Sequence, residues 1–442
     1  TKQALTAVHR AALAAMAWQL PGRVELLVLL CAFVAASVFV ALTFSPDGPP
    51  PSYHVKFEAT ALLSSQYSGA EDLPAAARIE DEALEPLNVE KLAAVESSRG
   101  GNKEKIAFVV VVTKDGPVLD GAGVLREAIR RSCWADYGAT AEGSTRYDYE
   151  YIAITNDEAV SPAMEDGLRR LRWKVDRRPL PVPVKDIEDP IYQEMVHKAG
   201  CCGAAEFLKL YAFALLEYKR VVLLDMDSFV MGCLDPLFDD NSTILFTYDM
   251  GMCKHCGRGP DEKVPPYQGG FFVVRPSQEH FDALAGIVRQ GDFREPKTKR
   301  KGVGWAGTGI GWYWGGRTIQ GIFPYYFSVV RPGVSKELDP CVYNNMVDNE
   351  ACQTIAAAEV RNCHFTVCQK PWKCRAARWR YDAEHQLCRE LHNKWFDARA
   401  EAAISLQLVD HDDVQSWAGT RTARQLACTE KGNYVPLLEV TR

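Results

Sequence analysis

The chain has 442 residues, of which 47% are hydrophobic and 24% are charged, and its formal net charge is −6. This is an ordinary globular composition, sufficient for one large domain or two smaller ones. Because the chain is mildly acidic and has no basic stripe, the composition argues against broad nucleic-acid binding, although not against a bound nucleotide.

The N-terminal region predicts a membrane anchor. Residues 26–44 are 19 residues without a charge, which span about 28 Å as a helix. Positive charges precede this segment, so the positive-inside rule places the short N-terminus in the cytosol or its equivalent and the bulk of the chain on the far side. A cleaved signal peptide is the alternative, but its apolar core would be shorter and nearer the start. We therefore expect a tail over 1–23 and a single-pass transmembrane helix over 24–45.

A folded α/β domain is predicted to follow a stem. Residues 46–102 are rich in proline, alanine and acids, which is typical of a stem or linker. Residues 104–113 form an unbroken aliphatic run, which indicates a strand buried on both faces and hence a parallel sheet covered by helices. Strands and helices then alternate, which favours an open α/β sheet. In chain order we expect a helix at 123–131, a strand at 149–155, a helix at 162–171 and a short strand at 173–175.

The stretch VVLLDMDSFV, residues 221–230, follows a segment with helical apolar spacing at 206–218. Side chains alternate along a strand, so Asp225 and Asp227 can point to one side where the strand ends. Ligands of open α/β sheets gather at the carboxyl ends of strands, and two carboxylates there suit Mg²⁺ or Mn²⁺. A chain of this length is also expected to hold one such DxD by chance, and residues 410–412 (DHD) form another without a preceding strand. Context must therefore distinguish the two.

The rest of the chain predicts fewer regular elements. Residues 269–276 (GGFFVVRP) indicate another buried strand. Residues 305–327 are dense in glycine and aromatic residues, and we expect a structured loop there with a helix near Ile319. Beyond Trp372 the sequence is polar, so the domain is expected to end near residue 375 and a small cysteine-containing appendage to cover 376–442.

Fourteen cysteines are many for a protein of a reducing compartment. Five lie between Cys352 and Cys388, and residues 253–256 (CKHC) form a CxxC. Half a zinc site is one interpretation of the CxxC, but no second CxxC or matched histidine pair completes it. Disulfides in a lumen are the favoured interpretation, and the glycosylation sequon at 241–243 gives weak support.

Three motifs in order carry a family resemblance. The first combines Lys209, the strand that ends in DMD, and DPLF at 235–238. The second is YQGGFFVVRPS at 267–277, and the third is HFTVCQKPW at 364–372. Together they resemble glycosyltransferase family 8, the glycogenin-like enzymes, over about residues 104–375. The resemblance implies a GT-A type open, mainly parallel Rossmann-like sheet flanked by helices.

The resemblance also implies a set of roles. Asp225, Asp227 and His364 would hold Mn²⁺ or Mg²⁺ against the diphosphate of a UDP-sugar, although alone His364 would pass for a packed or surface histidine. Lys370 would grip the diphosphate, and Lys209 would reach the donor sugar or phosphate. The implied reaction is retaining transfer of a hexose or pentose to a glycan or protein acceptor. The implied nucleotide contacts also include Val112, Thr113, Met226, Gln268 and Gly269, and Gln320 joins the two lysines as a catalytic candidate.

Several positions depart from the family pattern. Ile319 replaces the acid of an Asp-Gln-Gly block, Val367 replaces a glycine, and Gln268 stands where asparagine is usual. The metal and phosphate positions are therefore retained, whereas parts of the sugar pocket are not. The leading interpretation is a type II membrane glycosyltransferase facing the Golgi or ER lumen. The alternative is a catalytically silent subunit of a membrane complex. A mitochondrial or other organellar membrane fits this alternative, because the N-terminus has no acid before Glu25 and suits a targeting region.

Overall fold

The computed structural model describes residues 103–116, 119–134, 146–156, 160–249, 251, 264–296, 300–374, 386–409 and 423–438. All of them belong to one compact unit, Asp81–Arg442. The predicted tail, anchor and stem, the CxxC and the second DxD lie outside the described residues. Within these ranges, no helix is long and apolar enough to cross a membrane.

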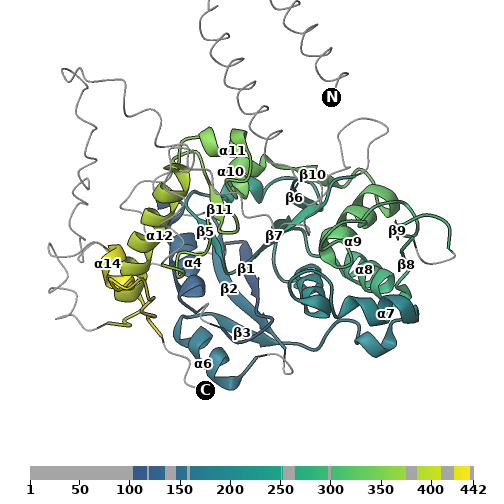
Figure 1. Ribbon diagram of the computed structural model, residues 1–442, viewed down its shortest axis with the longest axis horizontal. Coiled ribbons are helices and arrows are strands. Elements are labelled where there is room, and N and C mark those ends of the chain that lie inside the picture. Colours follow the sequence, from purple (N-terminus) through teal and green to yellow (C-terminus); the bar gives the residue numbers. More distant parts are fainter. Residues whose placement is uncertain are drawn as a thin grey trace, which may run out of the picture. The chain divides into compact units, whose positions relative to one another are not determined.

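A seven-stranded sheet forms the centre of the domain, with the order β10-β6-β7-β4-β1-β2-β3 (Figure 1). Neighbouring strands are parallel except for β7, which is antiparallel to both β4 and β6. The expected open, mainly parallel sheet is confirmed, while the buried strand expected at 269–276 is the antiparallel one. The strands are β1 (Lys105–Val111), β2 (Asp148–Thr155), β3 (Lys174–Arg177), β4 (Arg220–Leu224), β6 (Ile244–Tyr248), β7 (Tyr267–Val274) and β10 (Ser335–Glu337).

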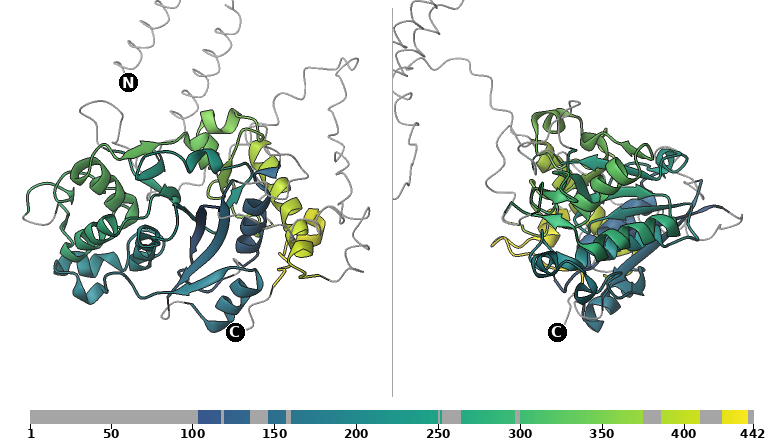
Figure 2. Two further views of the ribbon diagram at one scale, coloured as in Figure 1. Left: turned by 180° about the vertical axis from the view of Figure 1, so that it is seen from behind. Right: turned by 90° about the vertical axis from the view of Figure 1, so that its right-hand side faces the viewer.

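Strand β1 is buried on both faces, as its aliphatic run predicts. Because side chains alternate, Val109 contributes to one core cluster and Phe108 and Val110 to the other. Helices cover both faces, as Figures 1 and 2 show. The first cluster packs under α7 (Pro190–Val196), the 3₁₀ helix η3 (Gly203–Phe213), α8 (Gln278–Gln290) and α9 (Ile319–Tyr325). The second packs under α4 (Leu119–Arg131), α6 (Pro162–Arg170) and part of α12 (Gln386–Ser405).

The helix expected at 206–218 is the 3₁₀ helix η3, which begins at Gly203 and ends at Phe213. Its side chains are buried on nearly every side, including the charged Glu206 and Lys209. Apolar residues spaced three or four apart fit both a 3₁₀ helix and an α-helix, so the sequence pattern could not distinguish the two kinds of helix. The helix expected near Ile319 is confirmed as α9.

The segment expected as a C-terminal appendage contributes its described residues to the domain core. Helix α12 packs along α4, where the guanidinium Nε of the buried Arg399 donates to Asp120 Oδ2 at 3.1 Å. The disulfides Cys368–Cys388 and Cys374–Cys428 join this segment to the rest. In the chain-entropy account, loops of this length contribute about 3 to 4 kcal/mol of stability per bridge. Two further bridges, Cys133–Cys233 and Cys341–Cys352, lie among the described residues.

Candidate active site

The DMD triplet lies at the carboxyl end of β4, as the sequence predicts. After Leu224 the chain turns and enters β5 (Ser228–Val230). The turn is fixed by the amide of Ser228, which donates to Asp225 O at 2.9 Å, and by the amide of Asp225, which donates to Gly270 O at 3.2 Å. The Asp225 and Asp227 side chains are 33% and 15% exposed. Both acids therefore stand at the edge of the sheet, partly open to solvent.

Strand pairing brings His364 to these two acids. Strand β11 (Asn362–His364) pairs antiparallel with β5, and His364 lies opposite Ser228. Its Nε2 is 3.2 Å from Asp227 Oδ1 and 3.8 Å from Asp225 Oδ2. The three donor atoms lie within 4.8 Å of one another. Two carboxylate oxygens and one imidazole nitrogen suit Mn²⁺ or Mg²⁺, so the residues present fit such an ion.

The His364 imidazole packs against the backbone of β7. A Cβ atom on Gly270 would lie 2.5 Å from His364 Cε1 and 2.6 Å from Nδ1, so the ring packs directly on the glycine. His364 Nδ1 is buried without a hydrogen-bond partner in the described part of the chain, and Nε2 is the nitrogen that faces the carboxylates. Gln268, expected as a nucleotide contact, is buried; its Oε1 accepts from Gly270 N at 2.6 Å and Asn344 Nδ2 at 2.9 Å.

Two lysines contact the acids: Lys209, which precedes them in the sequence, and Lys370, which follows them. The Lys209 ammonium donates to Asp225 Oδ1 at 2.8 Å and to Gly269 O at 3.0 Å, and it pairs with Glu206 Oε2 at 3.1 Å. Its three donors therefore have three partners. The Lys370 ammonium pairs with Asp227 Oδ2 and donates to Phe365 O at 2.7 Å. Lys370 is 29% exposed, whereas Lys209 is 5% exposed, so Lys370 is the cation that an incoming anion can reach.

The neighbouring charges fix the ionisation of this cluster. Burial raises the pKa of Asp227, but the charges and hydrogen bonds of His364 and Lys370 outweigh it and hold that pKa well below its usual range. Burial lowers the pKa of Lys209, but Asp225 and Glu206 outweigh it and hold that pKa well above its usual range. At neutral pH Asp227 is therefore an anion and Lys209 a cation.

Two neighbouring residues of α9, Gln320 and Ile319, have different environments. The Gln320 side chain packs on Gly269, whose Cβ position is 3.2 Å from Gln320 Cγ, and Gly269 O is an acceptor for Lys209. Gln320 thus lies next to the cluster. Ile319 is fully buried in the apolar core and presents no polar group to the site.

The remaining expected nucleotide contacts lie at the same edge of the sheet. Strands β1 and β4 are parallel, and Val110 of β1 pairs with Leu224 of β4. The residues that follow the two strands, Thr113 and Met226 among them, therefore leave the sheet at the same edge. Val112 is fully buried and its amide donates to Ile154 O at 2.9 Å, which leaves only its carbonyl for a ligand. The Met226 side chain is half-buried against the core, while its carbonyl oxygen lies 2.7 Å from the Cβ position of Gly121.

Three residues that support the cluster were missed by sequence reasoning: Glu206, Gly270 and Asn344. Glu206 precedes Lys209 by three residues, a spacing that places two side chains on one side of a helix and could have indicated the ion pair. Gly270 stands in the second motif, but its contact is with a residue far along the chain. Asn344 gives no sequence signal.

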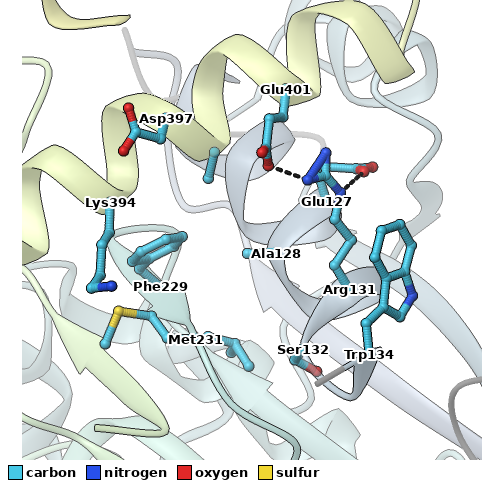
Figure 3. A pocket seen from close by; sticks show the side chains of 12 residues that line it. Glu127, Ala128, Arg131, Ser132, Trp134, Phe229, Met231, Lys394, Asp397 and Glu401 are labelled. Carbon is cyan, nitrogen blue, oxygen red and sulfur yellow. Dashed lines mark hydrogen bonds and ion pairs between the residues drawn. The ribbon is translucent and has the colours of Figure 1, made fainter. Parts of the chain in front are cut away.

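A hollow of about 400 Å³ lies elsewhere, between α4, α12 and β5 (Figure 3). In Figure 3, Glu401 of α12 faces Arg131 of α4, which pairs with both Glu401 and Glu127. Phe229 of β5 and Met231, which follows that strand, also line it. None of its lining residues belongs to the Asp225, Asp227 and His364 cluster. Because its charged groups are spread over two helices and partly paired with one another, the DMD edge remains the better candidate for chemistry.

Replacing Lys209 by methionine is expected to lower the free energy of unfolding by about 3 to 5 kcal/mol, because the buried Glu206 loses its cationic partner. Urea unfolding at pH 7.5 measures the change. The surface pair Lys336–Asp240, in which the lysine is exposed, provides the control, since Lys336→Met is expected to cost at most about 1 kcal/mol. Equal costs for the two substitutions would show that the Lys209 cluster is not the buried ion-pair network described.

His392 predicts a pH dependence of stability. Burial lowers its pKa to about 4, while the unfolded value is about 6.5. Between these values the unfolded chain binds a proton that the folded chain does not, so this contribution is complete above about pH 6.5 and is lost as the pH falls towards 4, at most about 3 kcal/mol. Urea unfolding at pH 7.5 and 4.5 tests this. His392→Asn should flatten the difference, whereas His197→Asn, at an exposed position, should not.

Comparison with known proteins was made on sequence and on structure. No protein-family model matches the chain, and no curated protein matches it. Solved structures that it resembles include glycosyltransferases. The bifunctional glycosyltransferase WbbM is 16% identical with a TM-score of 0.39, over 70% of this chain and 52% of WbbM, so the match spans about half of that protein. The glycosyltransferase GlyE of Streptococcus pneumoniae TIGR4 is 11% identical with a TM-score of 0.38, over 72% of this chain and 67% of GlyE. The galactosyltransferase LgtC, in complex with donor and acceptor sugar analogs, is 12% identical with a TM-score of 0.37, over 66% of this chain and 95% of LgtC.

Proposed function

We propose that this protein is a metal-dependent retaining glycosyltransferase of the GT-A type, similar to glycosyltransferase family 8. It would move a hexose or pentose from a UDP-sugar to a glycan or protein acceptor. The observation that carries the proposal is the convergence of Asp225, Asp227 and His364 at the carboxyl edge of the sheet. Two segments far apart in the sequence supply these ligands, and a lysine stands beside each acid.

Asp225, Asp227 and His364 would hold Mn²⁺ or Mg²⁺. When bound, the ion supplies positive charge to the diphosphate and makes UDP a better leaving group. Lys370 would bind the diphosphate; its ammonium, partly exposed beside Asp227, supports this role. Lys209 has three partners within the protein and acts as a positioning residue for Asp225.

The reaction would break the bond between the anomeric carbon and the phosphate oxygen. The acceptor hydroxyl attacks from the same face, and its proton passes to the departing phosphate oxygen. This scheme requires no general base from the chain. Gln320 would contact the sugar; its packing on Gly269 beside Lys209 supports this role.

The test uses the full chain in detergent with Mn²⁺ and a panel of UDP-sugars, with release of UDP as the readout. We expect release with at least one sugar, and thermal stabilisation by UDP that requires Mn²⁺. If no sugar donor releases UDP, and UDP does not stabilise the protein in the presence of Mn²⁺, the proposal is refuted.

A second candidate is a non-catalytic subunit that retains the fold. The burial of Ile319 favours it, because the position that carries an acid in the resembled family offers no carboxylate to the site. This candidate predicts Mn²⁺-dependent binding of UDP without release of UDP from any sugar donor. It also predicts co-purification with other membrane subunits when the tagged chain is extracted in mild detergent.

For location we propose a single-pass type II membrane protein facing the Golgi or ER lumen. Four disulfides among the described residues and the predicted anchor support an oxidising compartment. Asn241 of the sequon is exposed. A glycosidase-sensitive mass that disappears in Asn241→Gln is the expected result. The alternative, an organellar membrane such as the mitochondrial inner membrane, predicts no such glycan.

A further inference from the structure

Two adjacent cysteines, Cys201 and Cys202, lie next to the candidate active site. Both are free thiols; Cys201 is exposed and Cys202 is half-buried. Their Sγ atoms are 2.7 Å apart. The flanking Gly200 and Gly203 have φ angles of 58° and 59°, a left-handed conformation that glycine adopts without strain. The turn between these glycines therefore brings both sulfurs together.

A short chain of contacts links the pair to the proposed metal ligands. The Cys201 thiol donates to Glu206 Oε1 at 3.4 Å. Glu206 pairs with Lys209 at 3.1 Å, and Lys209 donates to Asp225 at 2.8 Å. A change at Cys201 can therefore reach Asp225 through Glu206 and Lys209.

The second thiol contacts another part of the same site. The Thr113 side chain, just beyond the end of β1, lowers the pKa of the Cys202 thiol through a hydrogen bond. The Cβ position of Gly200, next to the pair, is 3.5 Å from Gly315 Cα, and Gly315 packs on Gln320. The two cysteines thus lie between the expected nucleotide contacts and the expected sugar contact.

We propose that Cys201 and Cys202 form a thiol–disulfide redox site that reacts with low-molecular-weight disulfides. The Cys202 thiolate attacks the reagent, forms a mixed disulfide and releases one thiol. The Cys201 sulfur then attacks the Cys202 sulfur, forms the bond between adjacent residues and releases the second thiol. The protein loses two electrons and two protons, and the reagent is reduced to two thiols.

The local chemistry assigns the order of attack. The contact between the two sulfurs lowers the pKa of the Cys202 thiol and raises the pKa of the Cys201 thiol, which keeps its proton towards Glu206. Cys202 is therefore the thiol that ionises first and attacks first. Consecutive Cα atoms are about 3.8 Å apart, less than the separation of about 4.4 to 6.8 Å usual for disulfides. A bond between neighbours is accordingly strained and easily reduced, which makes the reaction reversible.

Ring closure has a consequence that rests on the proposed function. It removes the thiol proton that Cys201 donates to Glu206, and it converts the Cys202 thiol beside Thr113 into a disulfide sulfur. Both changes act on groups that border the proposed metal and nucleotide site. We expect oxidation to weaken the binding of UDP with Mn²⁺ at least about fivefold, roughly 1 kcal/mol.

The test treats the full chain in detergent with oxidised glutathione, then alkylates it and digests it with trypsin. Cleavage after Lys198 and Lys209 places both cysteines in one peptide, residues 199–209. We expect this peptide to lose two hydrogens and to escape alkylation, and dithiothreitol to restore two alkylatable thiols. Cys363, which is buried, should stay a free thiol in the same sample. Two thiols that remain free, or a glutathione adduct that does not resolve to the ring, would overturn the proposal.

A binding titration then measures the consequence. Oxidised and reduced wild type are titrated with UDP in Mn²⁺, and the double variant Cys201→Ser, Cys202→Ser is the control, expected to bind equally well with and without oxidant. Equal affinities of the oxidised and reduced wild type would overturn the link to the site. Reduced wild type that binds no UDP would count against the proposed function, while the mass of peptide 199–209 would still decide the redox site.

Discussion

Asp227→Asn is expected to lower kcat/KM for Mn²⁺-dependent UDP release by about a thousandfold, or about 4 kcal/mol of transition-state stabilisation. The side chain keeps its shape but loses the charge that faces His364 and Lys370. One of the two carboxylate ligands is then lost, and Lys370 loses its anionic partner Asp227. Initial rates of UDP release over a range of UDP-sugar concentrations, at saturating Mn²⁺, measure the effect.

The chain supplies its own control for this substitution. Residues 410–412 form a second DxD, which follows no predicted strand. Asp412→Asn is expected to leave the rate within about twofold of wild type, because nothing in the proposal assigns it a role. If Asp227→Asn kept more than a tenth of the wild-type rate, Asp227 would not be a metal ligand.

Gly270→Ala is expected to destabilise the protein and to abolish Mn²⁺ binding together. The new Cβ would overlap the His364 ring, at 2.5 Å from Cε1. Strand β7 cannot move away, because it is paired with β4 on one side and β6 on the other. Displacing a packed group of this size costs about 1 to 3 kcal/mol of unfolding free energy. Urea unfolding and a Mn²⁺ titration measure the two effects.

The matched control is Gly286→Ala on α8. A Cβ there would meet no atom within 4 Å, and the residue lies inside a helix. The substitution is expected to stabilise the protein by about 0.5 to 1 kcal/mol, since alanine favours a helix over glycine. Mn²⁺ binding should be unchanged. A Gly270→Ala protein that is as stable as wild type and still binds Mn²⁺ would mean that the ring does not depend on this contact.

The sheet could be predicted because its signals are local. The aliphatic run at 105–112 places side chains on both faces of β1, which requires helices on both sides. The same logic places DMD at the end of β4. The direction of each strand was harder to predict, because β7 is buried along its whole length like β4, although the two strands run in opposite directions. Burial on both faces shows in the sequence; strand direction does not.

The site could be predicted only where a motif marks it. His364 reaches Asp227 through the pairing of β11 with β5, a contact between distant segments that no local pattern encodes. Only the resemblance to a known motif indicated it. The support from Gly270 and the position of the Cys201–Cys202 pair likewise depend on long-range packing. The structure brings together residues that the sequence could only name separately.

The most direct measurement is a Mn²⁺ titration of the reduced full chain in the presence of UDP, followed by electron paramagnetic resonance of the bound ion. The proposal predicts one Mn²⁺ per chain, bound to nitrogen and oxygen ligands, with the nitrogen coupling lost in His364→Ala and binding lost in Asp227→Asn. Saturable binding that survives both substitutions, or no binding at all, would contradict a metal centre formed by Asp225, Asp227 and His364.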